Sequence, residues 1–115
     1  MASRAPRINV KNADAAKAHS LIETLFRELA EKWRKETSLT SSVQDMVINH
    51  HYQRIIGLGS QAVPLILQEL QQRPDHWFWA LAAITGENPI VESDEGNLKK
   101  MTEAWLKLGK ERGWI

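Results

Sequence analysis

Cysteine is absent from this chain of 115 residues. Its absence excludes disulfide bridges, thiolate metal sites and thiol catalysis, and it fits a reducing compartment such as the cytosol. The chain also has no apolar run near the ~18 residues that a membrane-spanning helix needs, and its first residues are not followed by the apolar segment of a signal peptide. We therefore expect a cytoplasmic protein that does not enter a membrane.

An excess of charge of one sign is also missing. The 15 Lys and Arg residues are balanced by 14 Asp and Glu residues, which gives a formal net charge of +1. Such a chain has no global attraction to nucleic acids or anionic lipids. Hydrophobic residues, by contrast, make up an ordinary 43% of the sequence. Length and composition therefore predict a single soluble globular domain that buries its core without help from metals or disulfides.

Catalytic and nucleotide-binding motifs are missing as well. The sequence contains no Gly-x-Ser-x-Gly elbow, no Walker-type loop and no complete dinucleotide fingerprint. Gly57 and Gly59 lack the third glycine and the preceding strand that a phosphate-binding loop requires. The carboxylates Glu92, Asp94 and Glu95 occupy a polar segment, where solvated charge is the expected role. These absences predict a protein without enzymatic activity.

The four histidines do not have the spacing of a known metal site. His50 and His51 are adjacent, so on a helix their side chains point about 100° apart. A metal ion would need these two, His76 and a carboxylate such as Asp45 or Glu69 to converge in space. We expect surface or capping histidines instead, with no metal or other cofactor.

Helical periodicity runs through most of the chain. From Asp14 onward, apolar residues recur at three- and four-residue steps, with charged residues on the other side, which predicts a long amphipathic helix. Asn12 or Asp14 can cap its start. The expected apolar stripe of this helix comprises Ala18, Leu21, Ile22, Leu25, Phe26, Leu29 and Trp33.

Several shorter helices are expected after the first. Ser60 and Asp75 are predicted N-caps, while Gly57, Gly59 and Gly86 are predicted helix ends, since glycine tolerates the left-handed backbone there. The sequence thus predicts an all-α fold, a compact bundle of about five helices. The expected elements after the first helix are a loop leading into a short helix over 37–49 and helices over 50–58, 60–73, 76–85 and 97–112.

The segments 59–70 (GSQAVPLILQEL) and 77–86 (WFWALAAITG) resemble a HEAT-type helical repeat. The resemblance implies an α-hairpin at the centre of the bundle. Because solenoids need about three stacked units, we expect the first and last helices to cover its open ends. The whole chain is also similar to a family of small uncharacterised bacterial proteins with the same Tyr-Gln-x-Ile-Ile and His-Trp-Phe-Trp-Ala-Leu core. That similarity implies a bacterial origin and no particular activity.

Five tryptophans are many for 115 residues, and their helical phase separates them. Trp33, Trp77 and Trp105 fall on apolar stripes and are expected in the core. Trp79 lies about 200° around the helix from Trp77, on a second face where a partner or another element would pack. The competing interpretation is that the first helix or the C-terminal Trp114 pair, which we expect to fold back, covers Trp79.

Residues 1–12 are basic and poor in apolar groups, so we expect a mobile tail followed by a single helical domain over 13–115. The tail supports one alternative function, a nucleic-acid-binding accessory protein. Its contacts would come from Arg4, Arg7, Lys11 and Lys17.

The sequence favours a non-enzymatic module that binds another protein through an apolar and aromatic surface. An antitoxin-like or immunity-like neutraliser, or an accessory subunit, would have these features. The partner is expected to be another protein, a second copy of the chain included, rather than nucleic acid or a membrane. The predicted partner-binding residues are Trp79, Trp114, His76 and Phe78.

Overall fold

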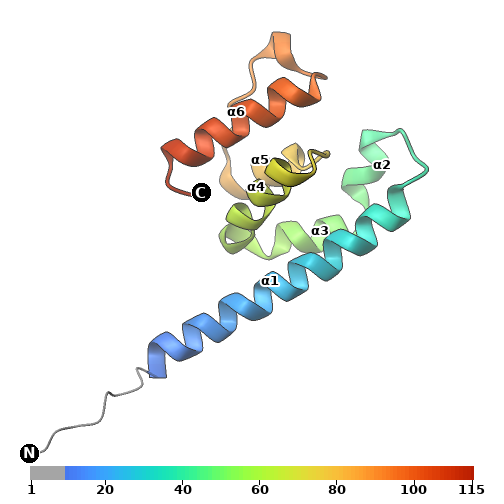
Figure 1. Cartoon of the computed structure of the whole chain (residues 1–115). Coiled ribbons are helices and arrows are strands. Elements are labelled where there is room, and N and C mark those ends of the chain that lie inside the picture. The colour runs from blue at the N-terminus through green and yellow to red at the C-terminus, as the bar shows by residue number, and fades with distance from the viewer. Residues whose placement is uncertain (1–9) are drawn as a thin grey trace, which may run out of the picture.

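The computed structural model describes residues 10–115, with side chains from residue 14 onward. This part of the chain consists of six α-helices and two short 3-10 helices and contains no strand (Figure 1), so the predicted all-α bundle is confirmed. The elements are α1 (Val10–Thr37), α2 (Val43–Ile48), α3 (His50–Gly57), η1 (Gly59–Ala62), α4 (Val63–Gln72), α5 (Phe78–Thr85), η2 (Glu92–Asp94) and α6 (Leu98–Glu111).

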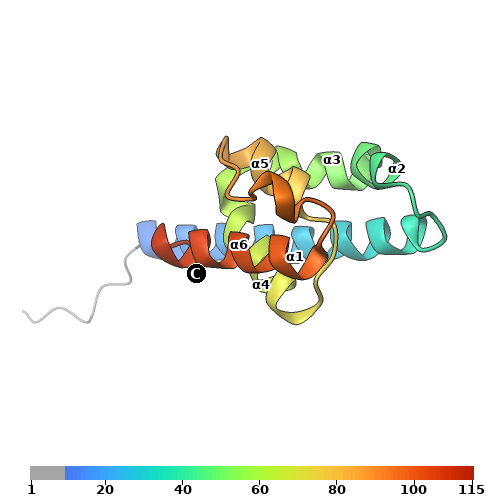
Figure 2. The ribbon, with the colours of Figure 1, turned by 90° about the horizontal axis from the view of Figure 1, so that it is seen from above.

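The helices form three layers. α1 lies on one side, α6 on the other, and α3, α4 and α5 lie between them (Figure 1). α1 packs mainly on α3, and α6 packs mainly on α4. Seen from above, α2 and α3 lie on one side of α1 and the end of α4 lies on the other (Figure 2). The first and last helices therefore cover the central helices, as expected.

The N-terminal part of α1 projects beyond the other helices (Figure 1). Every side chain from residue 14 to residue 21 is exposed, and Leu21 is 62% exposed. Ala18 and Leu21 therefore do not belong to the buried stripe predicted for this helix, because no other element reaches them. The helix also begins at Val10 rather than at Asp14, so residues 10–12 of the predicted tail are helical. Residues 1–9 lie outside the described part of the chain.

Three predicted helix N-caps are wrong. α1 begins at Val10, so Asn12 and Asp14 lie within the helix and do not cap its start. Ser60 lies within η1, and α4 begins only after Ala62, because a 3-10 turn precedes it. The Asp75 carboxylate accepts the amide of the next residue, His76, at 2.7 Å, and α5 begins at Phe78 with no side-chain cap. Ser60 and Asp75 lie in turns that continue for two or three residues before the α-helical hydrogen bonds start.

The three glycines predicted at helix ends have different roles in the structure. Gly86 ends α5 in the left-handed region, with a φ of 73°. Gly59 also has a positive φ, 74°, and it begins η1. Gly57 is the last residue of α3, as predicted, but its φ is not in the left-handed region. The left-handed residue at this break is therefore Gly59 alone.

The two segments that resemble a HEAT-type repeat, 59–70 and 77–86, form η1, α4 and α5. α4 packs on α5, but its main helix partner is α6. α3, which precedes them, packs mainly on α1 and α5.

Four aromatic rings dominate the core. Trp33 lies 4.4 Å from Trp77 between ring centroids, Tyr52 is stacked on Trp77 at 5.7 Å, and Phe26 lies 5.8 Å from the same indole. These rings bring α1 and α3 together with the start of α5. Trp105 is buried on α6. The predicted core positions of Trp33, Trp77 and Trp105 are confirmed.

A buried carboxylate links α4 to α1 beside these rings. Glu69 is buried, and its carboxylate lies 2.7 Å from the Arg34 guanidinium. Arg27 and Arg73 approach the same carboxylate at 4.0 Å and 3.6 Å. Because three guanidinium groups surround it, the buried negative charge is compensated.

The C-terminus folds back onto α6, as expected. The amide of Trp114 donates to the carbonyl of Gly109 at 2.8 Å. Trp114 is half-buried and packs against the edge of the core. The indole of Trp114 therefore contributes to the packing at this end of α6.

A candidate protein-binding groove

An apolar groove with a volume of about 560 Å³ opens over α5. We call it the Trp79 groove. Phe78, Trp79 and Ala82 of α5 line it together with His76 just before the helix. Its walls are α2, the segment from residue 88 to residue 96, and the first turns of α6.

α5 is apolar on almost every side. Ala80 and Leu81 are buried towards the core, whereas Phe78, Trp79 and Ala82 line the groove. A helix that is apolar all round is normally buried on all sides. Here one side stays open, and Trp79 is 59% exposed. The predicted second face of this helix therefore exists, and neither Trp114 nor α1 covers it.

The side chain of Tyr52 hydrogen-bonds to the backbone at the start of α5, on the core side of the groove floor. Its hydroxyl donates to the carbonyl of His76 at 2.9 Å and accepts the amide of Ala80 at 2.9 Å. Burial raises the pKa of the Tyr52 hydroxyl, so the group stays protonated and can donate. The two bonded backbone groups lie on either side of Phe78 and Trp79. One buried side chain thus fixes the backbone that presents both groove aromatics.

The α2 wall is also held by side chains of other helices. Val43 and Val47 line the groove, yet α2 has no fully buried residue. The indole nitrogen of Trp33 donates to the carbonyl of Met46 at 2.8 Å, and the Gln53 amide donates to the carbonyl of Val47 at 2.7 Å. These bonds add to the packing of Met46 and Val47 against the core and fix this six-residue helix.

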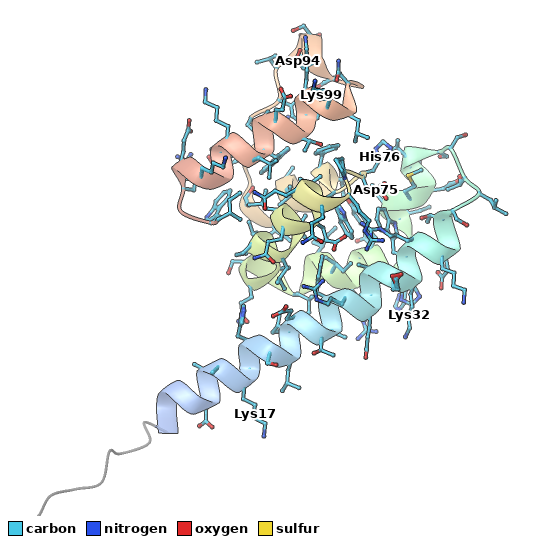
Figure 3. All side chains as sticks on the ribbon, viewed as in Figure 1. Lys17, Lys32, Asp75, His76, Asp94 and Lys99 are labelled. Atoms are coloured by element: carbon cyan, nitrogen blue, oxygen red, sulfur yellow. The ribbon has the colours of Figure 1, made fainter. Side chains whose placement is uncertain are left out.

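The opposite wall is acidic. The segment that forms it, counted with one residue more at each end (87–97), contains four carboxylates and no lysine or arginine. We call this segment the acidic wall. Glu87 hydrogen-bonds to the guanidinium of Arg112, which lowers the pKa of that carboxyl, and Asp94 lies 3.7 Å from Lys100. Figure 3 shows Asp94 and Lys99 at the outer end of this part of the structure.

Glu95 is the carboxylate of this wall that lines the groove. Neither Glu95 nor Glu92 forms an ion pair with any described side chain. The remaining residues that line this side are Asn88, Ile90, Gly96 and Met101. The groove thus combines an apolar floor with one uncompensated negative charge.

The structure brings together three of the four predicted partner-binding residues. His76, Phe78 and Trp79 line one groove, and Figure 3 shows His76 beside α2. Trp114 does not line it and packs on the core beside α6 instead. The helical phase of Trp79 therefore identified this surface, whereas the terminal position of Trp114 did not indicate a role in it.

The basic residues of the alternative function lie elsewhere. Arg4 and Arg7 are outside the described residues. Lys11 belongs to α1, and Lys17 is exposed on the projecting end of that helix (Figure 3). This end of α1 is remote from α2, which forms one wall of the groove (Figure 1).

His19 and His50 are exposed, His76 lines the groove, and His51 takes a structural position. Within the described residues, no group of three metal-ligating side chains comes together. His51 instead hydrogen-bonds to Glu36 at 2.9 Å. The side-chain hydrogen bond from Asn49, followed by that from His51, lowers the pKa of Glu36. These residues tie the end of α1 to the start of α3.

None of the helices over residues 10–115 combines the length and apolar character needed to cross a bilayer. Comparison of the chain with protein-family models, curated proteins and solved structures gave no match. The resemblances to a HEAT repeat and to small bacterial proteins stay predictions.

Proposed function

We propose that this protein is a non-enzymatic interaction module that binds another protein through the Trp79 groove. Trp79 carries the proposal, because a large aromatic side chain stands 59% exposed in an apolar groove. Aromatic anchors in apolar depressions dominate the binding energy of many protein interfaces. An accessory subunit, or a neutraliser that binds and blocks its target, would use such a surface.

The exposure of the lining favours a macromolecular partner over a small molecule. Small-molecule sites enclose about 70–90% of the ligand surface. In the Trp79 groove, the floor residue Trp79 and the wall residue Val43 are both among the exposed large hydrophobic residues. Exposed apolar side chains on both the floor and a wall suit a partner that extends beyond the depression.

The supports of the groove favour binding without rearrangement. Tyr52 fixes the floor, while Trp33 and Gln53 fix α2. A partner that docks on a rigid surface loses less free energy to ordering than one that docks on a mobile surface. The groove therefore has both an anchor and a fixed frame.

The test is the substitution Trp79→Ala. Because the indole is mostly exposed, the variant should keep the helical circular dichroism spectrum and unfold within about 1 kcal/mol of the wild type. Binding should weaken by about 2 kcal/mol or more. Proteins captured from a lysate of the source cell would be identified, purified and titrated against both forms, and sedimentation would reveal a second copy as the partner.

Two control variants make the result interpretable. Trp77→Ala should destabilise the fold by roughly 3–5 kcal/mol, because Trp77 is fully buried. Leu39→Ala removes a fully exposed apolar side chain outside the groove and should leave binding unchanged. A partner that binds Trp79→Ala as tightly as wild type would exclude the groove as the interface. Steep weakening with added salt would indicate a nucleic-acid partner instead.

A further inference from the structure

We infer that the segment occupying the Trp79 groove is a stretch of another protein that places an apolar side chain on Trp79 and a lysine or arginine beside it, paired with Glu95. This inference rests on the proposed function and adds the chemistry of the partner. Its basis is the lining of the groove, in which Glu95 is the one carboxylate among mainly apolar residues, with His76 and Asn88 as the other polar side chains.

The acidic wall has more carboxylates than cations to pair with them. Arg112 pairs with Glu87 and Lys100 pairs with Asp94. Glu95 lines the groove with no ion-pair partner among the described side chains. A bound segment that carries a cation would supply the missing partner.

The apolar floor of the groove is a second reason to expect a cation in the bound segment. Phe78, Trp79 and Glu95 line the same groove, so a wholly apolar segment that fills it removes water from the carboxylate. Taking water from a carboxylate without pairing it is costly. A lysine or arginine in the segment replaces the lost water by an ion pair, and the indole of Trp79 in the same groove can also attract a cation. Neutral and acidic segments gain neither contact.

The experiment uses a phage library of random 12-residue peptides as the probe. The library is selected on the folded wild-type protein, and bound phage are tested again on Trp79→Ala. Peptides that depend on Trp79 should share apolar residues with at least one lysine or arginine nearby. The enriched peptide is then synthesised, together with a version in which its basic residue is replaced by glutamate.

The binding variants are Glu95→Lys and, as a matched control, Glu92→Lys. Both residues are exposed and belong to the same segment, 88–96. Only Glu95 lines the groove. The basic peptide should bind Glu95→Lys roughly fivefold or more weakly, and Glu92→Lys within about twofold of wild type. The glutamate version should prefer Glu95→Lys over the wild-type protein.

The outcomes separate the two proposals. Peptides that depend on Trp79 but show no basic residue, or that bind Glu95→Lys as well as wild type, would overturn the pairing and leave the groove as a protein-binding site. A selection without any peptide that depends on Trp79 would count against the groove itself. In that case, binding of a small apolar amine such as benzylamine would assign the groove to small molecules and overturn both.

Discussion

Tyr52 connects the hydrophobic core to the groove. Its ring packs against both Trp33 and Trp77, at centroid distances of 5.3 Å and 5.7 Å. Its hydroxyl hydrogen-bonds to two backbone groups of the segment that carries Trp79. The same residue therefore contributes apolar contact on one side and hydrogen bonds on the other. Removing the hydroxyl alone leaves the ring contacts in place and tests what the two hydrogen bonds contribute.

Tyr52→Phe should lower the free energy of unfolding by about 1–3 kcal/mol, because the buried amide of Ala80 loses its partner. The ring contacts remain. Urea unfolding followed by circular dichroism measures the change. The affinity of the groove for its partner should also fall, since the backbone beneath Trp79 is no longer fixed. A variant as stable as the wild type would show that the hydroxyl bonds do not hold α5.

Residue-scale features differ in how far the sequence predicts them. Helical phase places Trp79 on a second face of its helix, because this needs only its position relative to Trp77. It leaves open whether another element covers that face. The bonds of Tyr52 join residues 24 and 28 positions apart, and no local pattern signals them. Asp75 and Ser60 are residue types that favour caps, but the turns around them decide where the helices begin. Local preference was overruled by tertiary context at both positions.

At the scale of elements, α4 and α6 approach closely at Gly109. A methyl group placed on Gly109 would lie 2.8 Å from Cδ1 of Leu67 and 3.3 Å from Cγ1 of Ile115. Leu67 is fully buried, so its methyl group has little space to move. Glycine is therefore required here by packing against the neighbouring helix.

Gly109→Ala should destabilise the protein by about 1–3 kcal/mol, although alanine is ordinarily better than glycine inside a helix by up to ~1 kcal/mol. The matched control is Gly57→Ala on α3, where nothing lies within 4 Å of the added methyl group, and which should be neutral or stabilising. Thermal unfolding of both variants measures the contrast. Shifts of the same sign at the two positions would contradict the close approach.

The acidic wall is tied to the end of α6 through Glu87 and Arg112. The guanidinium lowers the pKa of Glu87 below its ordinary value of 4.5. A lowered pKa in the folded state stabilises the fold above the ordinary value, and this contribution is lost as the pH falls through the lowered pKa. The Glu87–Arg112 pair therefore stabilises the attachment of this wall to α6 at neutral pH, and the stabilisation is lost in acid.

Glu87→Gln should lower the melting temperature at neutral pH, and the gap to the wild type should close as the pH falls below 4.5. Differential scanning calorimetry at a series of pH values measures this gap. Glu92→Gln is the control, since Glu92 lies in the same segment and forms no described ion pair. A gap that stays constant with pH would mean that another contact holds the wall.

The sequence does not predict which elements form the walls of the groove. Val43 and Val47 are four residues apart and share a helical face, which is a weak signal that α2 presents an apolar side. Ile90 and Met101, by contrast, reach the groove because the segment after α5 and the start of α6 fold over it. Their positions depend on the path of the chain between helices, and a periodic pattern contains no information about that path.

For the molecule as a whole, the packed body ends part of the way along α1. Leu29 is 1% exposed on this helix, and Leu21, two turns earlier, is 62% exposed. Both leucines look alike in a periodic pattern. The sequence predicts one continuous stripe because it shows the helix but not the extent of its neighbours.

Leu29→Ala should lower the free energy of unfolding by about 2–5 kcal/mol, because it leaves a cavity in the core. Leu21→Ala should change it by no more than about 0.5 kcal/mol, as for other exposed positions. Chemical unfolding of the two variants compares the same substitution on the same helix. Equal losses would show that the projecting part of α1 is covered in solution.

The uneven burial of the indoles has an optical consequence. Trp33, Trp77 and Trp105 are buried, Trp114 is half-buried, and Trp79 is mostly in contact with solvent. Collisional quenchers such as acrylamide will therefore reach the fluorescence of Trp79 well before that of the others. A partner seated in the groove shields that fluorophore and shifts its emission towards the blue, so the unlabelled protein reports its own occupancy.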